Sequence, residues 1–253
     1  MIDSHCHLTD PRLGDQLAGV IARARVAGVS MLITIGTSPD DSAAAIAVAE
    51  KYPDVVRAVV GVHPNHCGEV EVEALSRIKD LAQHPLVVAV GEMGLDYFHN
   101  HADRKRQRVF FERQLSIAVD AKKPVVIHSR EAIKDALQIV KSFGPVRAVF
   151  HCFTGTLDEA HAIVEAGHYV GFTGPITYKN NDALRETVRV VPSDRILIET
   201  DAPYLSPEPV RSHKTCEPAF VAHTLAQLAL IRGILLHEAD AMTTQNTRAF
   251  YGM

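Results

Sequence analysis

The strongest constraint on the fold is an alternation of short β-forming runs with segments of helical periodicity. After the first run, for example, Leu17, Val20, Ile21 and Ala24 recur at helical spacing. The pattern predicts eight strands, near residues 2–7, 31–36, 56–62, 86–91, 124–128, 146–151, 168–172 and 195–200. Because strands that alternate with helices pair in parallel through right-handed crossovers, we predict an α/β protein built as a (β/α)8 TIM barrel.

The length supports a single barrel. The chain has 253 residues, and a (β/α)8 barrel typically takes about 250. We therefore expect one domain over residues 1–253, with helical segments that include 104–121, 130–142, 156–166, 218–231 and 237–250. An open doubly wound sheet is the competing arrangement. It loses support because no glycine-rich dinucleotide fingerprint follows the first strand.

Composition narrows the class of protein. The formal net charge of −4 disfavours a protein that coats nucleic acid through bulk electrostatics. The apolar runs are too short for a membrane span, and no signal-peptide pattern opens the chain. Four scattered cysteines without a C-x-x-C pair indicate free thiols. We expect a cytoplasmic protein with no membrane partner, as a monomer or weak oligomer.

Ligand-type side chains stand where the predicted strands end. Since the carboxyl ends of all barrel strands lie on one face, these side chains are expected to converge. They are His5, His7, His63, Glu92, His128, His151 and Asp201. A single histidine in such a place is more often a packed residue, so the joint pattern carries the prediction. Strand alternation turns Cys6 and Cys152 away, to pack among the helices.

This set is larger than one metal ion needs. A catalytic zinc takes three protein ligands and a water, whereas five imidazoles and two carboxylates are available here. We infer two divalent ions with one carboxylate bridging them, as in hydrolytic sites whose ions lie about 3.5–4 Å apart. The mixed nitrogen and oxygen set suits Zn or Mn, while Mg favours oxygen ligands. The choice among Mg, Mn and Zn stays open.

Seven motifs together match one known family. They are Ile2-Asp3-Ser4-His5-Cys6-His7-Leu8, Gly61-Val62-His63-Pro64, Gly91-Glu92-Met93-Gly94-Leu95-Asp96-Tyr97, Ile127-His128-Ser129-Arg130, His151-Cys152-Phe153-Thr154-Gly155, Gly174-Pro175-Ile176-Thr177-Tyr178-Lys179-Asn180 and Glu199-Thr200-Asp201-Ala202-Pro203-Tyr204-Leu205. The chain resembles, over its whole length, the TatD family of metal-dependent deoxyribonucleases among the amidohydrolase-like barrels. One departure is Cys216, where the family usually has Asn before Glu-Pro.

The resemblance implies a role for each ligand-type residue. The metal ligands would be His5, His7, Glu92, His128, His151 and Asp201, with Glu92 bridging the two ions. His63 would lie beside them and contact the substrate phosphate. The implied activity is that of a deoxyribonuclease or exonuclease which cleaves phosphodiester bonds with a metal-activated water.

The hypothetical mechanism assigns catalytic roles to Asp201, Glu92 and His63. Asp201 takes a proton from the attacking water, and His63 donates a hydrogen bond to a phosphate oxygen. For substrate binding we add Arg130, Tyr97 and Lys179, which follow predicted strands 5, 4 and 7. Tyr97, Phe153 and Tyr178 are candidates for stacking on a splayed base. A site at the bottom of a loop-rimmed pocket favours nucleic acid that is single-stranded or presented as an end.

Two other functions remain open at this point. The first is an amidohydrolase-type hydrolase of a small ester, lactone, amide or phosphotriester. Many such enzymes bridge their ions with a carboxylated lysine, and no lysine stands at the end of predicted strand 4 or 5. The second is a non-catalytic barrel that binds a metal or a partner. Such a protein would not need both His63 and Asp201 beside an open coordination position.

Overall fold

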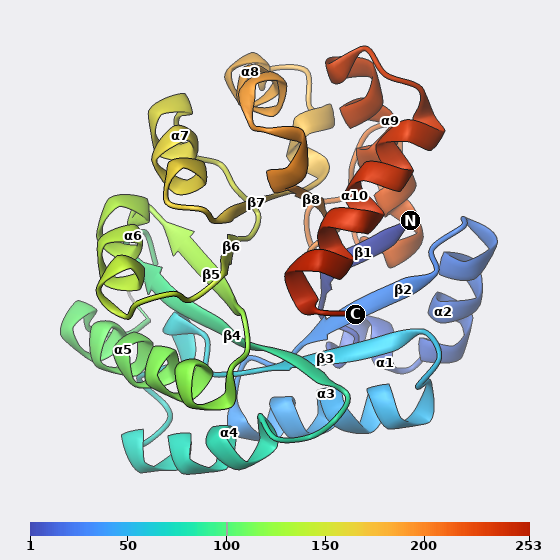
Figure 1. The fold of residues 1–253 in the computed structure, drawn as a ribbon. Helices are drawn as coiled ribbons and strands as arrows, with labels where there is room; N and C mark the ends of the chain where they lie inside the picture. Colours follow the sequence, from blue (N-terminus) through green and yellow to red (C-terminus); the bar gives the residue numbers. More distant parts are fainter. Residues whose placement is uncertain (100) are drawn as a thin grey trace.

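Eight parallel strands curl into a nearly closed barrel with the helices outside it (Figure 1). The computed structural model describes residues 1–99 and 101–253. The strands follow chain order: β1 (Ile2–Cys6), β2 (Met31–Ile35), β3 (Val56–Val60), β4 (Val87–Asp96), β5 (Val125–Arg130), β6 (Ala148–Phe150), β7 (Tyr169–Phe172) and β8 (Ile196–Ile198). The predicted (β/α)8 barrel is confirmed.

Several helices begin at a residue whose side chain caps the first turn. Ser38 accepts a hydrogen bond from the Asp41 N–H at 3.2 Å, and Thr156 forms a capping box with Glu159. The helices are α1 (Pro11–Gly14), α2 (Leu17–Val26), α3 (Pro39–Lys51), α4 (Leu75–Leu81), α5 (Arg104–Ala121), α6 (Ile133–Ser142), α7 (Leu157–Glu165), α8 (Asp182–Val190), α9 (Val221–Arg232) and α10 (Leu236–Tyr251).

Within residues 1–99 and 101–253, no individual helix has the length and apolar character needed to cross a membrane. One pair, Pro218–Arg232 with Leu236–Tyr251, meets the length and composition criteria only when taken together, and it is bent by 110°.

Apolar side chains pack on both faces of the sheet. One cluster fills the barrel interior, with Ile33, Val59, Val126 and Leu197 from the strands. Phe250 at the end of α10 joins this cluster. A larger cluster lies between the strands and the surrounding helices, and Cys6 is fully buried within it, as strand alternation predicts.

The barrel closes between β1 and the segment that follows β8. The Asp201 N–H donates to the His5 carbonyl at 2.9 Å, and the His7 N–H donates to the Ala202 carbonyl at 2.7 Å. Inside the seam, the buried Asp3 carboxylate accepts from the Thr200 N–H at 2.9 Å. The hydrogen bonds that close the barrel therefore also bring three of the ligand-type residues together.

Strand β4 differs from the prediction, which ended it near residue 91. It continues to Asp96, and its register against β5 shifts between Val90 and Met93, where β4 gains one residue. A bulge of this kind redirects side chains, and Glu92 lies within it. Gly91 and Gly94 have φ of 149° and 141°, a backbone region that glycine adopts readily and other residues rarely do.

We expect Gly94→Ala to lower the free energy of unfolding by at least about 2 kcal/mol, through overpacking and backbone strain. An added Cβ at Gly94 would overlap the His128 carbonyl oxygen. The matched control is Gly14→Ala, because a Cβ there meets nothing within 4 Å. Urea denaturation measures both variants. Equal stability of the two would contradict the account of β4.

Candidate metal centre

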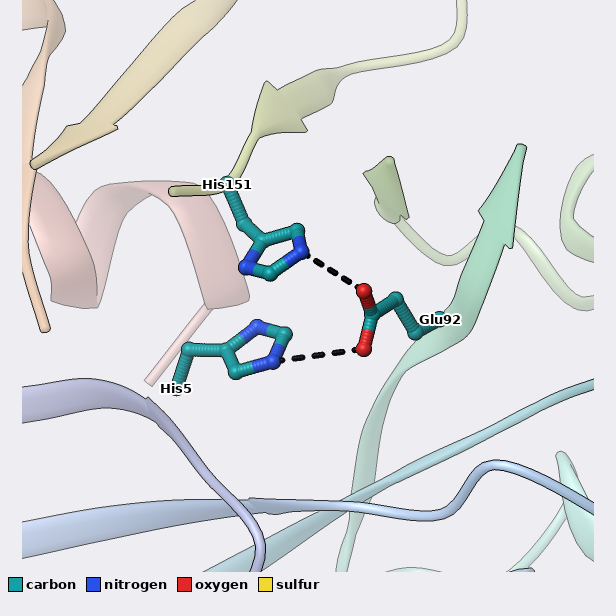
Figure 2. Close-up of side chains that lie close together, drawn as sticks. All are labelled: His5, Glu92 and His151. Carbon is teal, nitrogen blue, oxygen red and sulfur yellow. Dashed lines mark ion pairs between the residues drawn. The ribbon is translucent and has the colours of Figure 1, made fainter. Parts of the chain in front are cut away.

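The buried carboxylate of Glu92 lies among five imidazoles at the carboxyl end of the barrel. Glu92 is 2% exposed. Its Oε1 lies 2.6 Å from His151 Nε2, 3.0 Å from His128 Nδ1 and 3.4 Å from His63 Nε2. Its Oε2 lies 3.4 Å from His5 Nε2 and 3.8 Å from His7 Nε2. Figure 2 shows the two oxygens directed at different histidines, Oε1 at His151 and Oε2 at His5.

His5, His7 and Asp201 form a triangle of ligand atoms. The two Nε2 atoms are 3.3 Å apart, and Asp201 Oδ1 is 3.5 Å from His5 Nε2 and 3.3 Å from His7 Nε2. Metal–ligand bonds of about 2.0–2.1 Å in a tetrahedral site separate neighbouring ligand atoms by about 3.3 Å. The observed separations therefore fit a divalent cation held by these three residues.

A second group lies on the other side of Glu92. His151 Nε2 is 3.4 Å from His128 Nδ1, and both atoms approach the same oxygen of Glu92, at 2.6 Å and 3.0 Å. The group presents two imidazole nitrogens and one carboxylate oxygen, a donor set that suits Zn or Mn. The ligand atoms of His5, His7 and Asp201 are close enough to share an ion, and so are those of Glu92 with His5 and His151 and of Glu92 with His63 and His128.

His63 differs from the other imidazoles because its hydrogen bonds and its pKa indicate a neutral ring that can donate a hydrogen bond. Its Nδ1 accepts a hydrogen bond from the backbone N–H of Asn65 at 3.1 Å. Burial lowers the pKa of His63 to about 4, so the ring is neutral at pH 7. A neutral imidazole that accepts at Nδ1 carries its proton on Nε2. In this tautomer Nε2 carries a donor proton, 3.4 Å from Glu92 Oε1 and at the wall of the cavity that His63 lines.

The two central carboxylates are held in their ionised forms. Burial alone raises the pKa of Glu92, but the surrounding imidazoles outweigh it and hold that pKa well below its usual range. The pKa of Asp201 is also below its usual value, because its hydrogen bond to His7 and the neighbouring imidazoles outweigh its burial. One buried anion and one that is 14% exposed require positive charge nearby, which a divalent cation supplies directly.

A cavity of about 720 Å³ opens above this centre. Glu92, His7, His63, His128, His151 and Asp201 line it, and so does Arg130. Tyr97 and Lys179 are not among its lining residues; the Tyr97 hydroxyl instead donates to Asp135 at 2.9 Å. The predicted metal ligands therefore lie together at this cavity, with His63 and Arg130 beside them. Tyr97 and Lys179 do not line it.

Cys152 corrects one prediction. It lines the cavity instead of packing among the helices. β6 already ends at Phe150, and Cys152 has a φ of 45°, so strand alternation no longer governs where its side chain points. Cys216, the departure from the family pattern, is fully buried, and its N–H donates to the Pro203 carbonyl at 3.0 Å.

Comparison with known proteins identifies the family. A family model described as TatD related DNase matches residues 2–252. The chain belongs to the TatD family. It is 37% identical over 259 residues to a protein of Erwinia tasmaniensis named 3′-5′ ssDNA/RNA exonuclease TatD, and the match covers 100% of both chains. TatD-family membership makes the chain a metal-dependent hydrolase, as the recognised motifs predicted.

Further relatives extend the same match. A Bacillus subtilis protein named as the metal-dependent hydrolase YabD is 34% identical, over 99% of this chain and 98% of its own length. The crystal structure of YjjV, a TatD homolog from Escherichia coli, superposes with a TM-score of 0.94 at 28% identity, covering 100% of this chain and 98% of that one. The E. coli phosphotriesterase homology protein, at 14% identity and a TM-score of 0.68, shares the fold.

Behind His128 lies a second carboxylate to which sequence reasoning gave no role. Asp96 Oδ2 is 3.1 Å from His128 Nε2 and 2.8 Å from His99 Nδ1. Its Oδ1 accepts the N–H groups of Phe98 and His99 at 3.0 and 2.8 Å. An ionised carboxylate only accepts, so it favours a proton on His128 Nε2 and leaves Nδ1 free for a metal. The sequence feature that could have predicted this role is the spacing of Asp96 from Glu92, because residues i and i+4 lie on the same face of a strand.

Glu199 occupies the corresponding place behind His151. Its Oε1 lies 3.6 Å from His151 Nδ1 and accepts the Cys152 N–H at 2.6 Å, while its Oε2 accepts from the Ser4 hydroxyl at 3.1 Å. A Cβ at Gly171 would lie 2.8 Å from both carboxylate oxygens, so the glycine leaves room for Glu199. In this TatD-family chain the buried Asp96 carboxylate therefore orients His128 from outside the candidate metal centre, whereas Glu199 lies near His151 without a hydrogen bond to its Nδ1.

Replacing Asp96 tests this orienting role. In Asp96→Asn, the amide oxygen can keep the two backbone hydrogen bonds while the NH₂ group faces His128 Nε2. The proton then moves to His128 Nδ1 and blocks the metal-binding nitrogen. We expect affinity for Zn²⁺ or Mn²⁺, measured by calorimetry on metal-stripped protein, to fall about 10–100-fold.

The matched control is Asp135→Asn, because Asp135 lies exposed on α6 and outside the cavity-lining set. Its metal affinity should equal that of the wild type. Unchanged affinity in a folded Asp96→Asn protein would contradict the orienting role and leave Asp96 as a loop anchor.

Proposed function

We propose that this protein is a two-metal phosphodiesterase that releases nucleotides from single-stranded nucleic acid or from strand ends. The observation that carries the proposal is that the two carboxylate oxygens of Glu92 face different histidines. Oε2 faces His5 and His7, and Oε1 faces His128 and His151. A carboxylate shared in this way between two groups of donors is suited to bridging two ions.

The ligand assignment follows from the two groups. We infer that His5, His7 and Asp201 hold one ion, that His128 and His151 hold the other, and that Glu92 bridges them. The nitrogen-rich donor set favours Zn or Mn over Mg. When bound, such ions lower the pKa of water from 15.7 to about 7 and offset charge on the phosphoryl group.

The protein's own side chains then bind the substrate and move its protons. Asp201 is ionised and accepts the proton of the attacking water. The Nε2–H of His63 donates to a non-bridging phosphate oxygen, a role that its neutral tautomer supports. Arg130, from the end of β5, binds a second phosphate oxygen at the cavity wall. The proposal leaves out Tyr97 and Lys179, because neither lines the cavity.

A nucleic-acid substrate is supported by the relatives. The Erwinia tasmaniensis protein is named a 3′-5′ ssDNA/RNA exonuclease, and the matching family model is described as a DNase. The buried position of Glu92 supports unpaired strands, because an intact duplex is too broad to bring its backbone to the bottom of such a cavity. We further propose a single domain that acts as a monomer or weak oligomer in the cytoplasm, where its four free cysteines would stay reduced.

End-labelled single-stranded DNA tests the proposed function. We expect nucleotide release by the metal-loaded protein, loss of release on chelation, and recovery when Mn²⁺ or Zn²⁺ is added back. Glu92→Ala should lower the rate by at least about 100-fold, the scale of losing one electrostatic stabiliser. The matched control is Glu186→Ala on α8, where the side chain is 53% exposed and pairs with Arg189. Hydrolysis of a small ester without any release of nucleotides would overturn the proposal.

A further inference from the structure

An exposed aromatic ring stands beside the candidate metal centre. Tyr204 follows Asp201 by three residues in the loop after β8, and 47% of it is exposed. It lines the cavity, and its ring centre is 6.0 Å from that of His7, with the two planes at 79°. Among the described residues that line the cavity, it is the one Phe or Tyr side chain.

The ring is held in place by neighbours on another element. The guanidinium of Arg12, on α1, lies 4.4 Å from the Tyr204 ring centre. Arg12 is itself fixed, since its Nε and Nη2 donate to the two oxygens of Asp10 at 2.9 and 2.8 Å. Because Asp10 neutralises this guanidinium, Arg12 is better suited to supporting the ring than to binding phosphate.

Three aromatic side chains that the sequence offered for stacking are engaged elsewhere. Phe153 is 3% exposed. The hydroxyl of Tyr178 donates to the Ser206 carbonyl at 3.0 Å, and Arg211 covers its ring at 3.8 Å. Tyr97 lies under Arg104 at 4.1 Å. None of these three side chains lines the cavity, whereas Tyr204 does, and this leaves Tyr204 as the candidate for an aromatic contact inside it.

We propose that Tyr204 stacks on the nucleobase next to the scissile phosphate. This inference rests on the proposed nuclease function and adds the group that recognises the base. A phosphate bound beside His7 brings an adjoining nucleotide within reach of a ring only 6.0 Å from that imidazole. Every base has a π-face, so this contact tolerates sequence. It requires an unpaired base, which favours single strands over the interior of a duplex.

A saturated base separates stacking from every other contact. The substrates are an oligothymidylate and the same strand with 5,6-dihydrothymidine at the two terminal positions of both ends. Dihydrothymine keeps the hydrogen-bonding groups of thymine but loses its planar aromatic ring. We expect wild-type kcat/KM to favour thymine by about tenfold, at the lower part of the range for base–aromatic stacking.

Variants then assign the preference to Tyr204. Tyr204→Leu should abolish it by slowing the thymine substrate alone, and Tyr204→Phe should retain it. Tyr97→Leu is the matched control outside the cavity and should also retain it. The metal content of each variant is measured, so that loss of ions is distinguished from loss of stacking.

The outcomes separate this inference from the function on which it rests. A wild type that cleaves both strands equally overturns the stacking role and leaves the nuclease function standing. A preference for thymine that persists in Tyr204→Leu also overturns the stacking role and leaves the nuclease function standing. Tyr204→Ser replaces the leucine variant if that variant fails to fold. A metal-loaded wild type that releases nothing from either strand overturns both proposals.

Discussion

The buried carboxylate of Glu92 is the constraint on which the rest of the site depends. An ionised group that is 2% exposed cannot rely on water, so compensation must come from its neighbours. Five imidazoles provide this compensation at distances from 2.6 to 3.8 Å, four of them from the ends of β1, β5 and β6 and one from the segment after β3. The β4 bulge, with glycines on both sides of Glu92, fits this carboxylate into the crowded end of the barrel.

The same backbone hydrogen bonds close the barrel and position residues of the candidate metal centre. The backbone hydrogen bonds that join β1 to the segment after β8 run through His5, His7 and Asp201. The outer carboxylates extend the same connection, because Glu199 accepts from Ser4 on β1 and from Cys152 after β6. A change that loosens the seam therefore also disturbs the first ligand triangle, which couples stability to metal binding.

The features of the structure that follow from hydrophobic periodicity and from the order of the strands could be predicted from the sequence. Alternating β-forming and helical patterns predicted the barrel, and the strand-end position of His5, Glu92 and His151 predicted their convergence. Features set by irregular backbone could not. The extension of β4 depends on a register shift, and the exposure of Cys152 to the cavity depends on a φ of 45° beyond the end of β6. The orienting role of Asp96 depends on the tautomer of His128, which only distances between side chains indicate.

The central claim is that Glu92 joins two metal ions. Anomalous diffraction from crystals of protein loaded with Mn²⁺ or Zn²⁺ tests it most directly. The account predicts two peaks per chain, about 3.5–4 Å apart, with Oε2 of Glu92 on the ion of His5 and His7 and Oε1 on the ion of His128 and His151. A single peak at full loading, or two peaks with no contact to Glu92, would contradict it.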